Sequence, residues 1–322
     1  MTYNRVTEGE RILIYRWRQE KVSIREIGRR LGRSASTISR EIRRNSGGRG
    51  YRAKQAHEKA LERARRPGVR RFTEAVRSYV EEHLGKGWTP EAISGRLRLE
   101  GLASVCKETI YKYIYADYKA GGKLWLRLPR SHRKRRRRCS RNDGRGRGRI
   151  PNQRSIDSRP AEVATRQTAG QWEGDLIQGA AQTGYLITIV ERKSRYTLLA
   201  RTESKEAGEV TAIMSVLFQA MPSALRQGLT LDNGKEFAFH EQLSQTTGLE
   251  VFFAHPYHAW ERGSNENTNG LIRRLYPKGS SFREIGNPEL QLLDRYLNDR
   301  PKKCLGWKTP REEMNAFLVG TP

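Results

Sequence analysis

The stretch TLDNGKEF (230–237), followed after a short connection by VFFAHPYHAWERGSNENTNGLIRR (251–274), decides the fold of the second half of this 322-residue chain. An apolar run ends just before Asp232, and the Asn-Gly pair that follows this aspartate is a turn signal. The apolar residues at 251–253 predict a second short strand, and Glu266 lies where a helix would begin. A carboxylate at a strand end and a carboxylate on a facing helix are half of a two-metal site.

A third carboxylate is available upstream, at Asp175 in the run WEGDLI (172–177). This run has strand character, and two further apolar runs follow it with a turn between them. A helix is then predicted at 206–220 from apolar residues at helical spacing. The predicted order is strand-strand-strand-helix-strand-helix-strand-helix, with Asp175 on the first strand, Asp232 after the fourth and Glu266 on the last helix.

Three carboxylates suit the chemistry of phosphodiester cleavage and strand transfer. That chemistry uses two divalent cations about 3.5–4 Å apart, and Mg²⁺ prefers oxygen ligands while keeping room for waters and substrate phosphates. Asp175 would bridge both ions, with Asp232 and Glu266 each binding one. The plain alternative is a set of surface acids. The surface-acid alternative is weak for the two aspartates, because each adjoins an apolar strand. It is stronger for Glu266, because Glu261 is a nearby candidate for the same role. Glu261 precedes a Gly-Ser break, so we expect it outside the helix.

The helix that carries Glu266 presents Asn269 and Arg273 on the same face, at i+3 and i+7. Arg273 should therefore project beside a metal-bound phosphate, to which an arginine can donate two hydrogen bonds. The plain alternative is a solvated helix residue. Arg274 is the natural comparison, because it points about 100° away on a helix of about 3.6 residues per turn.

These motifs, with ERGSNENTNGLIRRLYPKG (261–279) and LNDRPKKCLGWKTPREE (297–313), resemble those of DDE transposases and retroviral integrases, and most closely the IS-thirty family of bacterial insertion-sequence transposases. The 33 residues between Asp232 and Glu266 are that family's spacing. The resemblance implies an α/β, ribonuclease-H-like integrase catalytic core with a mixed five-stranded sheet, in a multidomain protein with an all-α front half. It also implies a Mg-dependent DDE transposase, a DNA endonuclease and strand transferase with two Mg²⁺ or Mn²⁺ ions at Asp175, Asp232 and Glu266.

Charge divides the chain into two parts. The formal net charge is +27, and residues 1–150 hold 41 Lys+Arg against 15 Asp+Glu, while the rest holds 21 against 20. Such a one-sided excess favours a polyanion-binding front half over the plain alternative of a basic surface that aids solubility. Three widely spaced cysteines make no disulfide framework and suit a reducing cytosol. The sequence shows no membrane-length apolar run and no secretory signal, so we expect a cytoplasmic, nucleoid-associated protein.

Residues 7–45 have the pattern of a helix-turn-helix, within a first DNA-binding domain predicted at 1–50. Ser23 is a good N-cap for the second helix, with Glu26 completing a capping box, and Ser34 caps the third. The outward face of that third helix would enter the major groove, whereas an ordinary helical hairpin with a solvated face is the alternative. The residues of this predicted DNA-binding face are Ser36, Thr37, Arg40, Arg43 and Arg44.

A second helix-turn-helix domain is predicted at 73–118, after a basic linker helix at 51–72. Thr89-Pro90 opens its middle helix, because proline is favoured at the first helical position. Its last helix is expected at 104–115. The residues of that helix available to DNA are Lys107, Thr109 and Lys112.

The segment 119–160 contains a run of arginines and a Gly/Arg repeat, and the catalytic core with its C-terminal helices is expected at 161–322. The charged run lacks apolar residues and repels itself, so we expect a flexible arm that becomes ordered on DNA. Its arginines would add salt-dependent affinity without sequence preference. Those singled out are Arg135, Arg136, Arg137 and Arg138.

The resemblance implies that the front half recognises the terminal inverted repeats of an insertion sequence, and that the core carries out DNA transposition and integration. Two ends must be brought together, so at least a dimer on double-stranded DNA is expected. The competing interpretation is a DNA-binding regulator or assembly factor with an inactive integrase-like core, and the three carboxylates favour the enzyme. His255 and His258 have H-x-x-H spacing, but without nearby cysteines local packing or phosphate contact is favoured over zinc.

Overall fold

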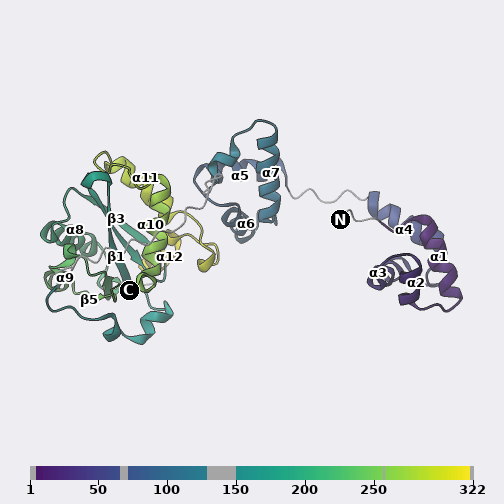
Figure 1. Ribbon diagram of the computed structural model, residues 1–322, viewed down its shortest axis with the longest axis horizontal. Coiled ribbons are helices and arrows are strands. Elements are labelled where there is room, and N and C mark those ends of the chain that lie inside the picture. Colours follow the sequence, from purple (N-terminus) through teal and green to yellow (C-terminus); the bar gives the residue numbers. More distant parts are fainter. Residues whose placement is uncertain (1–4, 66–71, 129–149, 257, 320–322) are drawn as a thin grey trace. The chain divides into compact units, whose positions relative to one another are not determined.

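The computed structural model describes residues 5–65, 72–128, 150–256 and 258–319. The chain forms two compact units, Met1–Arg70 and Arg71–Pro322, and each is described by itself (Figure 1). The predicted fold class is confirmed: helices are the regular elements of the described front half, and a five-stranded sheet with flanking helices follows. No described helix is long and apolar enough to cross a membrane.

Between residues 5 and 65 the first unit contains four helices: α1 (Glu8–Gln19), α2 (Ile24–Arg30), α3 (Ala35–Asn45) and α4 (Ala53–Arg65). One isoleucine from each of the first three helices forms its centre, and Ile14, Ile27 and Ile38 are all fully buried. The turn between α2 and α3 passes through Gly32 at φ +61°, a backbone conformation that glycine adopts without strain. This is the helix-turn-helix that the sequence predicts.

The predicted N-cap of α2 is present, but the predicted capping box is incomplete. Ser23 Oγ accepts a hydrogen bond from the Glu26 N–H at 3.2 Å. The Glu26 carboxylate pairs with the two arginines that follow on its own helix, at 2.7 and 3.0 Å, because charged partners compete with the backbone for it. A full box occurs at α1, where Thr7 and Glu10 each accept a hydrogen bond from the other's backbone N–H.

Helix α4, predicted as a basic linker, packs on the first unit. Ala56 is fully buried in the core of that unit. Lys59 donates a hydrogen bond to the Ser46 carbonyl oxygen at 2.8 Å, and Arg63 donates to the Asn45 side chain. Two basic residues of α4 therefore hold it at the C-terminal end of α3, where the helix dipole favours positive charge.

The second unit begins with the other helix-turn-helix, which consists of α5 (Glu74–Gly85), α6 (Pro90–Leu99) and α7 (Lys107–Lys119), followed by the 3-10 turn η1 (Leu124–Arg127). Thr89 caps α6, and Pro90 occupies its first turn, as predicted. The last helix begins and ends later than the predicted 104–115, because Val105 is buried ahead of it and Cys106 is its N-cap. The start of the predicted arm belongs to this domain, since η1 packs on its core.

The rest of the second unit is an α/β core on a mixed sheet with the order β3-β2-β1-β4-β5. Its strands are β1 (Gln171–Gln178), β2 (Tyr185–Glu191), β3 (Thr197–Thr202), β4 (Gly228–Leu231) and β5 (Glu250–Phe253). Strand β1 runs antiparallel to β2 and parallel to β4, with Glu173 opposite Thr230. Asp175 lies two residues after Glu173 in β1, and Asp232 lies two residues after Thr230, just beyond the end of β4. The parallel pairing thus brings the two predicted ligands to one edge of the sheet.

Different helices cover the two faces of β1 (Figure 1). Trp172 is fully buried against Phe218 of α8, and Gly174 points to the same face, where an added Cβ would lie 2.6 Å from a Leu231 methyl group. Side chains alternate along a strand, so Glu173 and Asp175 point to the opposite face and contact α10. The core helices are α8 (Ala207–Gln219), α9 (His240–Thr247), α10 (Gly263–Leu275), α11 (Asn287–Asn298) and α12 (Pro310–Val319).

The end of the predicted arm also belongs to a folded part, the catalytic core. Ile150 is buried in the hydrophobic core beneath the sheet. The Phe253 N–H donates to the Arg154 carbonyl oxygen at 2.8 Å, and Ser155 bridges to the same strand. The four arginines at 135–138 lie outside the described residues.

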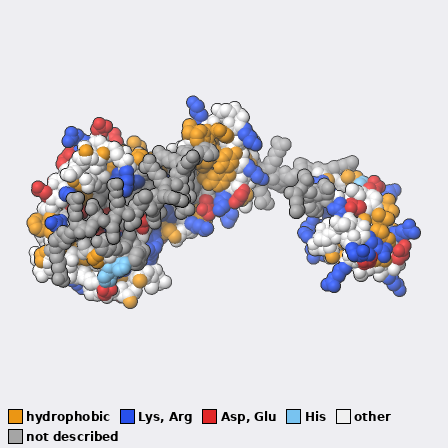
Figure 2. Space-filling view, viewed as in Figure 1, with side chains coloured by type: hydrophobic (Ala, Val, Ile, Leu, Met, Phe, Trp, Pro, Cys, Tyr) orange, Lys and Arg blue, Asp and Glu red, His pale blue; other side chains and the backbone are white. Residues whose placement is uncertain are grey.

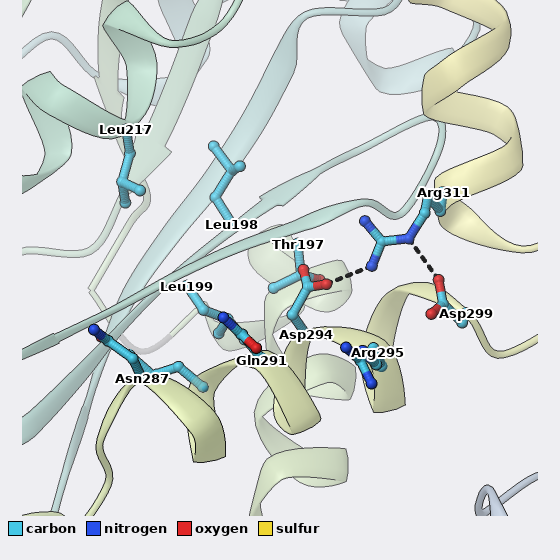
Figure 3. Close-up of a pocket in the computed structure, with 11 residues that line it drawn as sticks. Thr197, Leu198, Leu199, Leu217, Asn287, Gln291, Asp294, Arg295, Asp299 and Arg311 are labelled. Carbon is cyan, nitrogen blue, oxygen red and sulfur yellow. Dashed lines mark hydrogen bonds and ion pairs between the residues drawn. The ribbon is translucent and has the colours of Figure 1, made fainter.

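A pocket of about 620 Å³ opens between β3 and α11 (Figure 3). Arg311 of α12 pairs there with Asp294 and, at 2.6 Å, with Asp299. Its guanidinium is therefore engaged by two carboxylates, and none of the three predicted catalytic carboxylates lines the pocket. We interpret it as the junction that anchors α12 to α11.

Candidate active site

Asp175 and Asp232 contact a single guanidinium group. Arg262 Nη1 lies 3.5 Å from Asp175 Oδ1, and Arg262 Nη2 lies 3.2 Å from Asp232 Oδ2. The same side chain donates a hydrogen bond to the Gly174 carbonyl oxygen at 3.0 Å. The two carboxylates are thus close enough to share one positive charge. The sequence did not single out Arg262, although it stands four residues before Glu266.

Backbone and side-chain donors fix both aspartates. The Gly234 N–H donates to Asp232 Oδ1 at 3.0 Å, so the predicted Asn-Gly turn orients this carboxylate. The Leu176 N–H donates to Asp175 Oδ1 at 3.0 Å, and Asn269 Nδ2 donates to Asp175 Oδ2 at 2.6 Å. These hydrogen bonds fix the direction in which the carboxylate oxygens of both residues point.

Glu266 is exposed near the start of α10. Arg262 precedes it by four residues and Asn269 follows it by three, and both contact Asp175. Since positions i and i+3 lie on one helical face, Asn269 places Glu266 on the face of α10 that is turned toward Asp175.

The three carboxylates nevertheless do not meet at one point. In the described part of the chain, the one group of three potential ligand atoms within 4.8 Å of one another lies elsewhere, at His255, His258 and Glu261. The structure therefore brings Asp175 and Asp232 to one guanidinium, and the three predicted carboxylates do not form a group this tight among the described residues. Two ions about 3.5–4 Å apart can be held by such a spread set, because each ion uses a different outer carboxylate.

A second acidic residue of β1, Glu173, holds α10 against the sheet. It is fully buried, and its Oε1 accepts a hydrogen bond from Arg192 Nε at 3.0 Å. Its Oε2 accepts the backbone N–H groups of Ser264 and Asn265 at 2.9 and 3.0 Å. The residue at the N-cap of α10 makes no side-chain cap, so Glu173 satisfies the helix's first N–H groups from another element. Sequence reasoning missed this residue, although its place two positions before Asp175 implies the same face of the strand.

Negative charge is concentrated at this edge of the sheet. The pKa of Asp175 is raised, mainly by burial. The nearby charge of Arg262 lowers this pKa, and that of Asp232 raises it. Burial also raises the pKa of Glu236, and the negative charges of Asp232 and Asp175 raise it further. A bound cation relieves such repulsion, and the guanidinium of Arg262 stands where a cation is accommodated. The donors are carboxylate oxygens, which suit Mg²⁺ or Mn²⁺, so the residues fit a divalent metal ion.

The other predicted residues of this region lie as follows. Arg273 Nη2 donates to the Gln178 carbonyl oxygen at 2.6 Å, and its guanidinium lies 5.3 Å from the centre of the Phe282 ring. Its side chain therefore contacts the last residue of β1, while Arg274 is exposed. Glu261 lies outside α10, as predicted, in the 3-10 turn η7 (Ala259–Arg262).

The residues predicted to bind DNA are unevenly exposed. On α3, four of the five are exposed, and Arg40 folds back onto Ser36. Thr37 is half-buried, and its hydroxyl group hydrogen-bonds with Ser34. Lys and Arg side chains are spread over the visible face of the first unit (Figure 2).

On α7, the three predicted residues make local contacts or face solvent. Lys112 is exposed. Lys107 pairs with Glu91 at 3.6 Å, and the Thr109 hydroxyl group hydrogen-bonds with Cys106 Sγ at 3.2 Å. Only part of this face is therefore available without breaking an existing contact.

Comparison with known proteins gives two matching family models. One, described as a helix-turn-helix domain, matches residues 2–45, and the other, described as an integrase core domain, matches residues 165–259. The catalytic core domain of BIV integrase resembles this chain with a TM-score of 0.38 at 20% identity, over 47% of this chain and 98% of that one.

Two curated relatives match over almost the full length. The transposase for insertion sequence element IS4351 of Bacteroides fragilis is 39% identical, over 97% of this chain and 96% of that protein. The transposase InsI for insertion sequence element IS30A of Escherichia coli (strain K12) is 40% identical, over 95% of this chain and 82% of that protein. Identity at this level over nearly the whole chain, with both domains in place, shows that the protein belongs to the IS30 family of insertion-sequence transposases.

Proposed function

We propose that this protein binds the terminal inverted repeats of its own insertion sequence, cleaves the DNA strands at the ends and transfers them to target DNA. The observation that carries the proposal is the pair of aspartates at one sheet edge, Asp175 and Asp232, which already share a cationic group. Two oxygen ligands in this arrangement are suited to a divalent metal ion and to phosphodiester chemistry.

In this proposal Asp175, Asp232 and Glu266 would together hold two divalent ions, Mg²⁺ or Mn²⁺. When bound, such ions activate the attacking oxygen and stabilise the leaving oxygen. Asn269 holds the second oxygen of Asp175 in place through its 2.6 Å hydrogen bond. Arg273, at the far end of the same helical face, is assigned to the phosphate of the scissile end, where its charge persists at any physiological pH.

The front half grips the DNA ends. The basic outer face of α3, with Arg40, Arg43 and Arg44, is assigned to the major groove, and Lys107 and Lys112 of α7 are assigned to a second contact region. Both ends of the element must be cut, so the active species is at least a dimer on DNA. Mass measurement of the protein on repeat-end DNA, by light scattering after gel filtration, tests this assembly.

The deciding experiment is a strand-cleavage assay on DNA that carries the element's own inverted repeats, with and without Mg²⁺. Mg²⁺-dependent nicking at the repeat ends is expected for the wild-type protein, and Asp232→Asn should bind the ends but leave them uncut. The matched control is Asp299→Asn, because this aspartate pairs with Arg311 away from the site. A protein that binds its ends tightly yet cuts nothing in Mg²⁺ or Mn²⁺ would point to the regulator alternative.

A further inference from the structure

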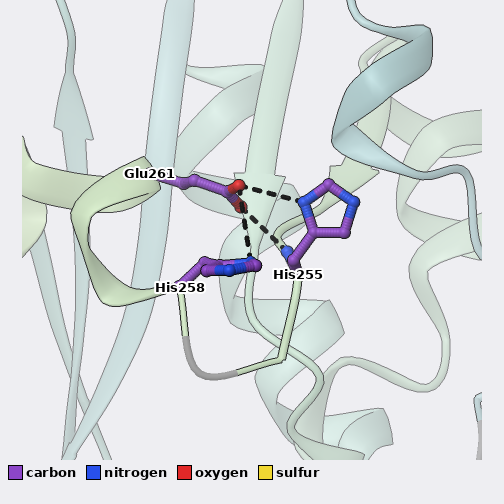
Figure 4. A group of neighbouring side chains, drawn as sticks. All are labelled: His255, His258 and Glu261. Carbon is purple, nitrogen blue, oxygen red and sulfur yellow. Dashed lines mark hydrogen bonds and ion pairs between the residues drawn. The ribbon is translucent and has the colours of Figure 1, made fainter.

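Three side chains of the loop after β5 converge at the surface of the catalytic core: His255, His258 and Glu261 (Figure 4). Their candidate ligand atoms all lie within 4.8 Å of one another. Glu261 Oε1 is 2.9 Å from His255 Nδ1 and 3.9 Å from His258 Nδ1. Tetrahedral zinc with bonds of about 2.0–2.1 Å sets its ligand atoms roughly 3.4 Å apart, and the two observed separations lie on either side of this value.

The local backbone produces this convergence. The His258 N–H donates to the His255 carbonyl oxygen at 3.2 Å, and the Glu261 N–H donates to the His258 carbonyl oxygen at 3.0 Å. Each bond closes a turn of the 3-10 type, which has about three residues per turn and stacks side chains at i and i+3. The H-x-x-H-x-x-E spacing therefore matches the period of the turns that carry it.

A fourth residue, Asp157, supports the group from the 3-10 turn η2 (Ile156–Ser158). Its Oδ2 lies 2.9 Å from His255 Nε2. With the proton on Nε2 donated to this carboxylate, the lone pair of His255 Nδ1 points toward Glu261. A carboxylate on the far ring nitrogen is the arrangement that orients metal-binding histidines. Glu261 Oε2 accepts the His255 backbone N–H at 2.9 Å, which leaves Oε1 directed at the histidines.

We propose that His255 Nδ1, His258 Nδ1 and Glu261 Oε1 bind one late first-row divalent transition metal ion, with Zn²⁺ the best match, and leave a fourth position open to water or a phosphate oxygen. Two imidazoles and one carboxylate form the ligand set of three-residue zinc sites. Nitrogen ligands select such ions over Mg²⁺, so this site differs in chemistry from the carboxylates of the candidate active site and does not depend on them. The set needs no cysteine, because Glu261 supplies the third ligand and Asp157 orients His255 from a distant part of the chain.

The position of the group gives it a consequence for the neighbouring site. Arg262 follows Glu261 directly and contacts both Asp175 and Asp232. An ion held by Glu261 fixes the turn from which the Arg262 side chain projects. Zinc binding therefore stiffens the segment between β5 and α10, next to the two aspartates.

The test is a titration of the metal-free, full-length protein with Co²⁺, a spectroscopic substitute for Zn²⁺, followed by visible absorption. One equivalent should give the intense bands of a four-coordinate ion with nitrogen ligands, and one equivalent of Zn²⁺ should remove them. His258→Ala and Glu261→Gln should each weaken binding at least a hundredfold, since a direct ligand is lost. Asp157→Asn should weaken it roughly tenfold, as loss of an outer-shell partner does. His57→Ala, in the first unit, is the matched control and should bind as wild type does.

Asp232→Asn separates this proposal from the proposed function. Co²⁺ held by carboxylates and water alone absorbs weakly, so the intense band should persist in this variant whether or not cleavage is lost. The proposal is overturned if the wild type gives no intense band, if the band survives in His258→Ala, or if it disappears in Asp232→Asn. Should His258→Ala fail to fold, thermal unfolding decides: Zn²⁺ must raise the Tm of the wild type and not that of Glu261→Gln, and an equal response in both also overturns it.

Discussion

Glu173 and Asp175 stand two residues apart on β1 and point to the same face of the sheet, yet their surroundings differ. Glu173 is fully buried, and a guanidinium and two helix N–H groups occupy its oxygens. Asp175 lies two residues nearer the carboxyl end of β1, and its carboxylate contacts the side chains of Arg262 and Asn269 and one backbone N–H. The comparison teaches that two carboxylates on the same face of one strand can have different roles. The fully buried one holds α10 in place, and the less buried one is available to a metal ion.

The largest expected effect is loss of cleavage at the edge of the sheet. Asp175→Asn, Asp232→Asn and Glu266→Gln should each reduce Mg²⁺-dependent cleavage of repeat ends by far more than the roughly 100-fold typical of an outer-shell change, because each removes a charged ligand. End binding, measured by gel shift, should stay within about twofold. The exposed Glu284→Gln is the control for the glutamate change. Substantial cleavage by Asp175→Asn would show that Asp175 is not required for the reaction, and the contrast with Glu173 would then fail.

The second effect is on stability. Glu173→Gln should lower the free energy of unfolding by about 3–5 kcal/mol, because it leaves the Arg192 guanidinium buried without its charged partner. Asp175→Asn should leave that free energy unchanged or raise it, since burial and the Asp232 charge both raise the pKa of Asp175 and so disfavour its ionised form. Urea unfolding followed by circular dichroism measures both. Equal losses in the two variants would show that both carboxylates are structural.

A double-mutant cycle sharpens the structural side of the comparison. Replacing Glu173 by Gln and Arg192 by Met together should cost about 1–3 kcal/mol less than the sum of the two single changes, because the pair then leaves no unpaired buried charge. The same urea unfolding gives the four values of the cycle. Simple additivity would mean that Glu173 acts through the α10 N–H groups alone.

The smallest effect concerns the far end of β1. Arg273 contacts the Gln178 carbonyl oxygen and the Phe282 ring, whereas Arg274 is exposed. Arg273→Ala should therefore slow cleavage of a bound end by roughly tenfold, the equivalent of about 1.4 kcal/mol in the barrier, and Arg274→Ala should change it little. Single-turnover cleavage of pre-bound ends tests this. Equal losses would mean that general basicity matters and that the face assigned to Arg273 plays no special part.

Local patterns predicted much of this structure. The order of strands and helices along the chain, the turn after Asp232 and the caps at Ser34 and Thr89 follow from short stretches of sequence, because hydrophobic period and cap chemistry act over a few residues. The contacts of Glu173 with Arg192 and of His255 with Asp157 join residues far apart in the chain. A single sequence carries no signal of such pairs, since only the folded register brings them together.

The same limit explains the two segments that packed more than expected. Helix α4 and the residues around Ile150 looked like basic connections, since charge dominates their composition. A few apolar side chains anchor them nonetheless: Ala56 in the first unit and Ile150 in the core. The high average charge of each segment therefore gave no indication that one apolar residue would be buried.

The buried capping role of Glu173 bears on how ageing copies of such an element should be read in a genome. One simple criterion for an intact copy is that its codons for Asp175, Asp232 and Glu266 survive. A copy in which Asp175, Asp232 and Glu266 are intact but Glu173 or Arg192 is replaced would meet that criterion. Its protein would nevertheless lose the contacts that hold α10 against β1. Counts of mobile copies based on three codons alone would therefore be too high.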